Sequence, residues 1–338
     1  MNDTIKFNKV VIWGHPINTH NHSYIQYGWF KAFKYLGYDT YWYDDNGYPS
    51  DIDYTNTLFI SEGSADKNIP INDSSIYCIY NTINPKKYIN ANARLIDLRP
   101  NVSHINDDIY IFNLDEKSVD NISDIVFYEK NSTDRDLNPR LRHHTLLNYE
   151  AIYLAWASDL LPDEINIDDI NIPANKPHES YFIGNIHDGN IKEMKKYMNS
   201  CSKKGIKFVH INSDNPTSFE TFKNKIQHSY VTVDIRGSGN SEMLKINNNG
   251  TNHKDIGFIS CRIFKNISYG KLGITNCPRA KKLFGDNIIV EENEDNMVET
   301  YLKHNNYEYI KKQMIWVRDN HTYINRISDL LKVINQQV

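Results

Sequence analysis

The chain has 338 residues, of which 40% are hydrophobic and 24% are charged, and its formal net charge at pH 7 is −4. This length and composition predict a globular protein large enough for two domains, and they exclude a disordered chain. The small negative net charge disfavours a protein that binds nucleic acid through a broad basic surface, although a local cationic groove is compatible with it.

The four cysteines lie far apart without CxxC spacing, which predicts reduced thiols rather than a zinc knuckle or a disulfide scaffold. No segment approaches the roughly 18 apolar residues that span a bilayer, and the N-terminus lacks the pattern of a signal peptide. We therefore expect a soluble, cytoplasmic protein without a membrane span. The heavy use of Asn, Ile, Lys and Tyr fits an AT-rich genome, such as that of a low-GC bacterium or of a large virus active in the host cytoplasm.

The first half of the chain has the pattern of a parallel α/β sheet. Residues 9–13 form an apolar β-branched run, residues 23–36 repeat apolar side chains at four-residue spacing before Gly37, and residues 40–43 form a second run. Further short runs predict strands at 58–60, 76–80, 95–98, 110–112 and 125–128. A strand, loop, helix and strand in this order predict right-handed βαβ units.

The same alternation restarts after a polar segment, residues 161–177, which contains three prolines and has the composition of a domain boundary. Strands are predicted at 181–183, 206–211 and 230–235, and helices at 189–204 and 218–228. A helix at 258–269, a strand at 272–275, a second helix and a strand at 287–291 follow. One apolar stripe then runs through residues 307–334, which predicts a terminal helix.

Polar residues follow the predicted strands of the second half, at the edge where α/β proteins bind ligands. Gly184 and Asn185 precede a helix, whose backbone N–H groups and dipole favour a phosphate, and Arg236 with Gly237 ends the strand at 230–235. One face of the helix at 258–269 carries four polar side chains: Arg262, Lys265, Asn266 and Tyr269. The alternatives are ordinary turns and a solvated cationic helix face.

Three histidines, His15, His20 and His22, follow the first predicted strand. An imidazole titrates near neutrality and can accept a proton from a hydroxyl group. Glu62 and the pair Asp44–Asp45 end later strands and are rival bases. The alternatives for the histidines are polar packing within the loop and a zinc site, but H-x4-H-x-H on an irregular loop supplies three ligands without a fourth.

The order of RIF at 262–264, Gly270, a strand, Thr275-Asn276 and LFGD at 283–286 is similar to the C-terminal half of GT-B glycosyltransferases, in particular the group that includes the bacterial spore-maturation type. Residues 318–326, which contain HTYxxR, resemble the closing helix of that group. Residues 151–159 resemble the strand that ends its N-terminal domain.

The resemblance implies two Rossmann-like parallel-sheet domains facing a cleft: an acceptor-side domain at 1–165 and a nucleotide-sugar-binding domain at 179–305. Residues 306–338 would form a C-terminal helix that packs across the domain seam. The implied activity is transfer of a sugar from a nucleotide sugar to a glycan or other hydroxyl acceptor. The implied donor site contains Gly184, Asn185, Arg236, Gly237, Arg262, Lys265, Asn266, Tyr269 and Asn276, and the candidates for catalysis are His15, His20, His22 and Glu62.

Arg262 and Lys265 are expected to stabilise the charge that grows on the leaving diphosphate, a task that a metal ion performs in other enzymes. We therefore expect no metal and no cofactor besides the nucleotide sugar as co-substrate. Many members of the family carry Glu where Lys265 stands, which leaves recognition of the donor ribose open, with Glu242, Asp255 and Asn276 as substitutes.

Two other functions fit the same fold: a sugar-nucleotide epimerase, which turns over the donor without an acceptor, and a non-catalytic protein that binds a glycan or a nucleotide. The pair Asp44–Asp45 is weak evidence for the metal-holding DxD motif of GT-A enzymes, since the two-domain layout disagrees with that fold. A nicotinamide dehydrogenase is disfavoured because the first turn reads GHPINTH rather than GxGxxG.

Overall fold

The computed structural model describes residues 7–17, 19–20, 22–99, 142–143, 150–173, 178–212, 218–239, 252–254 and 258–335. The strands predicted at 110–112 and 125–128, and the candidates Glu242 and Asp255, lie outside the described residues. By its contacts the chain divides into two compact units. The first comprises Met1–Ile17, His22–Ala155 and Tyr323–Val338, and the second comprises Asn18–Asn21 and Trp156–Thr322.

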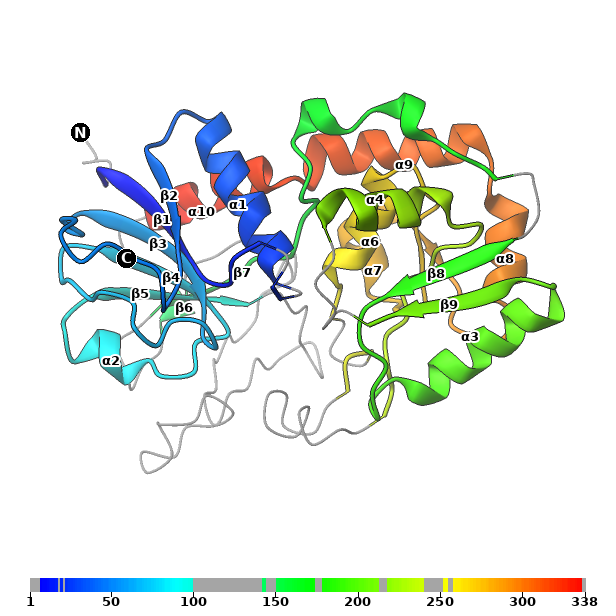
Figure 1. Cartoon of the computed structure of the whole chain (residues 1–338), viewed down its shortest axis with the longest axis horizontal. Coiled ribbons are helices and arrows are strands. Elements are labelled where there is room, and N and C mark those ends of the chain that lie inside the picture. The colour runs from blue at the N-terminus through cyan, green and yellow to red at the C-terminus, as the bar shows by residue number, and fades with distance from the viewer. Residues whose placement is uncertain are drawn as a thin grey trace. The chain divides into compact units, whose positions relative to one another are not determined.

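The first unit is built on a sheet with the strand order β2-β1-β3-β4-β5-β7-β6 (Figure 1). All of its pairings are parallel except that of β6 with β7. Every residue of β3 and β4 is buried, as expected for parallel strands that are covered on both faces. The strands are β1 (Lys9–Trp13), β2 (Thr40–Tyr43), β3 (Thr57–Glu62), β4 (Ile76–Tyr80), β5 (Arg94–Arg99), β6 (Arg142–His143) and β7 (Glu150–Tyr153). The strands predicted at 9–13, 40–43, 58–60, 76–80 and 95–98 are confirmed.

The described helices of this unit are α1 (Ser23–Tyr35), α2 (Lys86–Ile89) and α10 (Tyr323–Ile334). α1 ends just before Gly37, whose φ of +84° is the left-handed conformation that ends many helices. α10 packs against α1, and the ring centroids of Trp29 and Tyr323 lie 5.0 Å apart. The last helix of the chain is thereby part of the first unit.

The second unit contains two pairs of parallel strands, β8 with β9 and β10 with β11. Their bounds are β8 (Glu179–Ile183), β9 (Lys207–Ile211), β10 (Ile274–Thr275) and β11 (Ile289–Val290). The segment 229–236 joins the two pairs: Tyr230 N–H donates to the Glu179 carbonyl, and Asp234 forms an isolated parallel bridge with Thr275.

The strand predicted at 230–235 is therefore wrong as a regular strand, although its residues are buried. Two serine side chains form hydrogen bonds with backbone groups that would pair with other backbone groups in a regular β-ladder. Tyr181 N–H donates to Ser229 Oγ, and Ser180 Oγ donates to the Val231 carbonyl. Side-chain hydroxyl groups compete with sheet pairing in this way.

Helices flank these strands, with α4 in contact with β8 and α3 in contact with β9 (Figure 1). The helical elements are η2 (Pro162–Glu164), η3 (Ile167–Asp169), α3 (Ile191–Lys203), α4 (Phe219–His228), α6 (Cys261–Ser268), α7 (Ala280–Phe284), η4 (Gly285–Asn287), α8 (Met297–His304) and α9 (Tyr307–Asn320). The helix predicted from residue 258 begins at Cys261 because Ser260 caps it, its Oγ accepting from Arg262 N–H. None of the described helices is long and apolar enough to cross a membrane.

The segment 307–334 contains two helices, α9 and α10, rather than the one that its apolar stripe predicts. The helical conformation is interrupted at His321 and Thr322. There the His321 carbonyl accepts from Ser158 N–H, and Thr322 forms an isolated parallel β-bridge with Ser158. After the break the buried face of α10 is shifted. Ile324 and Leu331 of the predicted stripe are only half-buried, while Ile327 and Leu330 are fully buried.

Candidate functional site

Two arginines of the second unit meet at one buried carboxylate, that of Asp234. Its Oδ1 lies 2.8 Å from Arg236 Nη2 and 3.5 Å from Arg262 Nη1. The hydroxyl groups of Ser260 and Thr275 also donate to this carboxylate, at 2.8 and 2.9 Å. Asp234 is 1% exposed, so the ion pairs lie in a poorly solvated environment where charges interact strongly.

The Arg262 guanidinium lies against the end of β8. Its Nε and Nη2 donate to the Ile183 carbonyl at 3.3 and 2.9 Å, and its Cζ lies 4.1 Å from the centroid of the Phe182 ring. A Cβ on Gly184 would lie 2.3 Å from Arg262 Nη2, and the φ of Gly184 is +137°. The backbone conformation at Gly184 favours glycine, and a side chain there would also have to displace the guanidinium.

Two donors of the guanidinium groups make no hydrogen bond with a described residue: Nε of Arg236, and Nη1 of Arg262, which has only the ion-pair contact with Asp234 at 3.5 Å. Burial, together with the neighbouring charge of Arg236, lowers the pKa of Arg262 to about 10, which still leaves it protonated at neutral pH. Two cations thus face one carboxylate. Buried donors and an excess of buried charge are costly unless a partner completes them, and an anion is the partner that fits.

Asn276 holds the main chain of Arg236. Its Oδ1 accepts from Arg236 N–H at 2.6 Å, and its Nδ2 donates to the Arg236 carbonyl at 2.9 Å and to Glu294 at 2.7 Å. Gly237 follows at a close approach of two backbones, where a Cβ would lie 1.8 Å from the Gly189 carbonyl oxygen. Both residues position Arg236, while Asn185 is exposed after β8.

The polar face of α6 is buried rather than solvated, so the solvated-face alternative is wrong. Tyr269 is 2% exposed, and its hydroxyl group contacts both oxygens of Asp159 at 2.9 and 2.8 Å. Lys265 Nζ lies 3.5 Å from the same carboxylate, and Asn266 is 3% exposed. Lys265 thus pairs with Asp159, whereas Arg262 of the same helix shares Asp234 with Arg236 and keeps Nη1 without a hydrogen bond to a described residue.

Sequence reasoning missed Asp234, although an acidic residue inside an apolar, buried run signals a paired carboxylate. It also missed His187 and His253, which lie beside Arg236. Burial, and after it the charge of Arg236, lowers the pKa of both imidazoles, that of His253 to about 3. Neither histidine stands in a motif that would have distinguished it.

A second polar cluster lies in the first unit, where β1 and β3 are neighbours and end at the same edge of the sheet. Glu62 ends β3, His15 follows β1 and His22 caps α1. Glu62 contacts His15 Nε2 at 3.1 Å and His22 Nδ1 at 2.5 Å, and it accepts from Ser64 Oγ at 2.7 Å. The parallel register of β1 and β3 therefore brings together residues 47 and 40 positions apart in the sequence.

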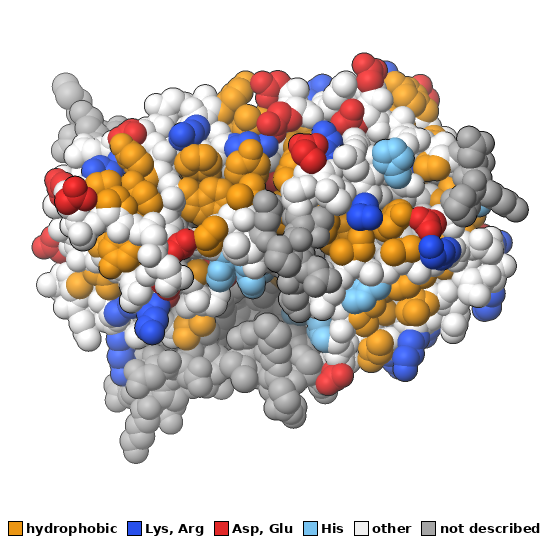
Figure 2. All heavy atoms as spheres, viewed as in Figure 1, with side chains coloured by type: hydrophobic (Ala, Val, Ile, Leu, Met, Phe, Trp, Pro, Cys, Tyr) orange, Lys and Arg blue, Asp and Glu red, His pale blue; other side chains and the backbone are white. Residues whose placement is uncertain are grey.

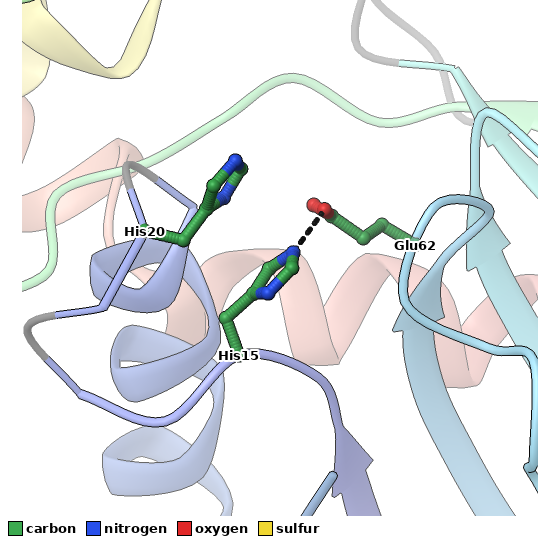
Figure 3. A group of neighbouring side chains, drawn as sticks. All are labelled: His15, His20 and Glu62. Carbon is green, nitrogen blue, oxygen red and sulfur yellow. Dashed lines mark hydrogen bonds and ion pairs between the residues drawn. The ribbon is translucent and has the colours of Figure 1, made fainter. Parts of the chain in front are cut away.

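Glu62 stays ionised in this cluster. Burial by itself would raise the pKa of its carboxyl group, but the hydrogen bonds with His15, His22 and Ser64 outweigh burial and bring the pKa well below its usual range. Figure 3 shows the hydrogen bond between His15 and Glu62, with His20 on the same loop. His20 is exposed.

An imidazole held by an ionised carboxylate is a suitable proton acceptor, because the carboxylate fixes the ring and stabilises its charged form. Asp45 is otherwise engaged: its oxygens accept from Trp13 Nε1 and from the N–H groups of Lys67 and Asn68. Asp44 accepts from the N–H groups of Asn46 and Gly47 in a turn. Both thus serve local structure.

One face of the molecule shows how the basic side chains are distributed. On the face shown in Figure 2, the described Lys and Arg side chains stand among Asp and Glu side chains rather than in one basic area. This distribution agrees with the low net charge of −4.

No protein-family model and no curated protein sequence matches the chain. Among solved structures it is similar to an α,α-trehalose-phosphate synthase (UDP-forming) from Burkholderia vietnamiensis, with 7% identity, a TM-score of 0.54, and coverage of 98% of this chain and 100% of that chain. It is also similar to an α-glucosyltransferase in complex with UDP and a 13-mer DNA containing a central A:G mismatch, with 8% identity, a TM-score of 0.51, and coverage of 97% and 99%. At these identities the likeness concerns the fold, and the chain has the GT-B glycosyltransferase fold.

Proposed function

We propose that this protein is a glycosyltransferase that takes a sugar from a nucleotide sugar. The observation that carries the proposal is the pair of guanidinium groups of Arg236 and Arg262, whose donors without a hydrogen bond to a described residue lie at the ends of the segment 229–236 and of β8 in a chain with the GT-B fold. In open α/β sheets this edge is where nucleotides bind. The second unit then holds the donor, and the first unit, with its histidines and Glu62, contacts the acceptor.

The arginines act on the leaving group. When the bond between the anomeric carbon and the phosphate oxygen breaks, negative charge grows on the nucleoside diphosphate, and fixed cations stabilise that transition state more than the ground state. Asp234 and the Ile183 carbonyl hold the two guanidinium groups in place before the donor arrives, and Asn276 holds the main chain of Arg236. Because these cations can take the role of a metal ion, we propose a metal-independent reaction without a further cofactor.

The proton of the acceptor goes to an imidazole of the first unit. A hydroxyl oxygen of a glycan or another hydroxyl acceptor forms the new bond to the anomeric carbon, and its proton passes to His15 or His22. Glu62 holds both rings, at 3.1 and 2.5 Å, and stabilises the imidazolium that forms. General bases of this kind contribute roughly 10²- to 10⁴-fold to a rate.

The test measures nucleotide binding and donor turnover. UDP is the first probe, because one similar solved structure is a complex with UDP and another is that of a UDP-forming synthase. GDP and ADP follow, all with EDTA present. The variants are Arg236→Lys and Arg262→Lys, with Arg318→Lys as the control, since Arg318 is a surface residue paired with Asp319.

We expect one nucleoside diphosphate to raise the thermal midpoint, and each test variant to weaken its binding about tenfold or more, as loss of a charged hydrogen bond of about 1.5–3 kcal/mol implies. The control should bind like the wild type. Failure of all nucleotides to bind, or binding by both test variants as tight as that of the wild type, would contradict the proposal. Donor turnover without an acceptor would indicate the epimerase instead, and binding without any turnover would indicate a non-catalytic protein.

A further inference from the structure

Two histidines beside Arg236 play no part in the mechanism above, and both present nitrogen atoms that the described residues leave unused. His187 lies in the turn before α3, and His253 precedes Lys254, whose N–H donates to the Gly237 carbonyl. Their ring centroids are 6.4 Å apart, with the ring planes at 87°. His253 packs on Phe258 at 5.0 Å, and the Arg236 Cζ lies 5.6 Å from that same Phe258 ring.

The hydrogen-bond pattern fixes which nitrogen of His187 carries the proton. Gly189 N–H donates to His187 Nδ1 at 3.1 Å, so Nδ1 is an acceptor without hydrogen. The ring is neutral at physiological pH because burial and Arg236 lower its pKa. Its single hydrogen therefore sits on Nε2, which makes no hydrogen bond with any described residue.

His253 is neutral for the same reasons, since burial first and the Arg236 charge second lower its pKa to about 3. A neutral imidazole offers one donor and one acceptor. Neither of its ring nitrogens bonds to the part of the chain that the structure describes. The environment of Arg236 thus combines one cation with an unsatisfied Nε, two neutral imidazoles and one aromatic ring.

This set of groups discriminates between ligand chemistries. A phosphate oxygen only accepts hydrogen bonds, so it could not donate one to the acceptor nitrogen of His253, and the two lone pairs would repel each other. A sugar hydroxyl both donates and accepts, which matches neutral imidazoles, and the C–H face of a sugar ring suits Phe258. The arrangement is therefore a place for a polyhydroxylated group directly next to the arginine that holds the phosphate.

We infer that His187 and His253 form the subsite for the transferred sugar of the nucleotide sugar whose diphosphate binds Arg236 and Arg262. The inference rests on the proposed function and adds a prediction to it: these histidines distinguish a nucleotide sugar from the nucleoside diphosphate alone. They bind hydroxyl groups of the sugar and leave the phosphates to the arginines.

The experiment compares two ligands on the full chain. Isothermal titration measures the dissociation constants of UDP and UDP-glucose, and of the GDP, ADP and corresponding sugar forms, for the wild type and two variants. His187→Asn keeps an acceptor for Gly189 N–H but removes the Nε2 donor. His253→Phe keeps the ring on Phe258 and removes both nitrogens. His228→Asn, on the exposed surface of α4, is the control.

We expect each test variant to bind the nucleoside diphosphate within about twofold of the wild type and the nucleotide sugar about tenfold more weakly, as the loss of a hydrogen bond or two implies. If a test variant binds the nucleoside diphosphate and the nucleotide sugar equally more weakly, the histidines contact the diphosphate. If the binding of both ligands is unchanged, the histidines contact neither ligand. Each of these results overturns the inference while the proposed function stands. Failure of the wild type to bind any nucleotide overturns both.

Discussion

Replacing Gly184 with alanine tests whether the end of β8 is built around the Arg262 guanidinium. Two costs combine in this variant. Residues other than glycine are strained at a φ of +137°, by about 1–3 kcal/mol. The new Cβ would also lie 2.3 Å from Arg262 Nη2 and would displace the guanidinium from the Ile183 carbonyl, at a cost of about 1.5–3 kcal/mol for a charged hydrogen bond.

The matched control is Gly205→Ala. Gly205 has a φ of +67°, but nothing lies within 4 Å of its Cβ position, so only the backbone cost of about 1–2 kcal/mol applies. Both substitutions restrict the unfolded chain equally, and that effect cancels in the comparison. The free energy of unfolding of Gly184→Ala should therefore fall about 2–4 kcal/mol further than that of the control.

Calorimetry measures this difference as a lower thermal midpoint, by roughly 5–15 °C relative to Gly205→Ala for a unit of this size. The same samples are titrated with the nucleotide that binds the wild type, and we expect about tenfold weaker binding or more for Gly184→Ala alone, because Arg262 has moved. The reasoning is refuted if the two alanine variants lose equal stability and bind the nucleotide equally.

Two further predictions concern pH. Since the folded state lowers the pKa of Glu62, this carboxylate stabilises the protein above its unfolded pKa of about 4.5, and the contribution is lost as the pH falls towards the folded value. Denaturant unfolding between pH 3 and 6 should therefore show that Glu62→Gln loses less free energy of unfolding with falling pH than the wild type. Equal pH slopes for the two proteins would contradict the pairing with the histidines. Lys271 is fully buried, with Nζ 2.8 Å from the Asn171 carbonyl, and burial lowers its pKa to about 7. Between about pH 7 and 10 the unfolded chain therefore binds more protons than the folded protein, and the free energy of unfolding of the wild type should rise over that range. In Lys271→Met that rise should disappear, and a rise that persists would show that Lys271 is not its source.

Local sequence patterns determined most of the elements. The apolar runs at residues 9–13, 40–43 and 76–80 became strands with those same bounds, because a β-branched run bounded by turns has few other ways to bury its side chains. Patterns that needed information from elsewhere failed. The stripe at 307–334 could not reveal the break at His321, which arises from hydrogen bonds to Ser158, more than a hundred residues earlier in the chain.

The candidate sites show the same division. Sequence reasoning selected Arg236, the histidines and Glu62 because strand ends in α/β proteins collect polar residues at one edge, and it selected Arg262 from the polar face of a predicted helix; their functional roles stay predictions. It gave Lys265 and Arg262 equal weight, since both lie on one face of one helix. Only the structure separates them, because Lys265 pairs with Asp159 while Arg262 shares one carboxylate, that of Asp234, with Arg236.

The sequence by itself thus determined the α/β class, the strands and the kinds of residue at their ends, because these depend on spacing along the chain. The tertiary structure alone decided which charges have partners within the protein and which buried donors keep no hydrogen bond among the described residues. That choice depends on partners distant in sequence, such as Asp234 for Arg262 and Glu62 for His15 and His22, and on the burial that makes an unpaired donor costly.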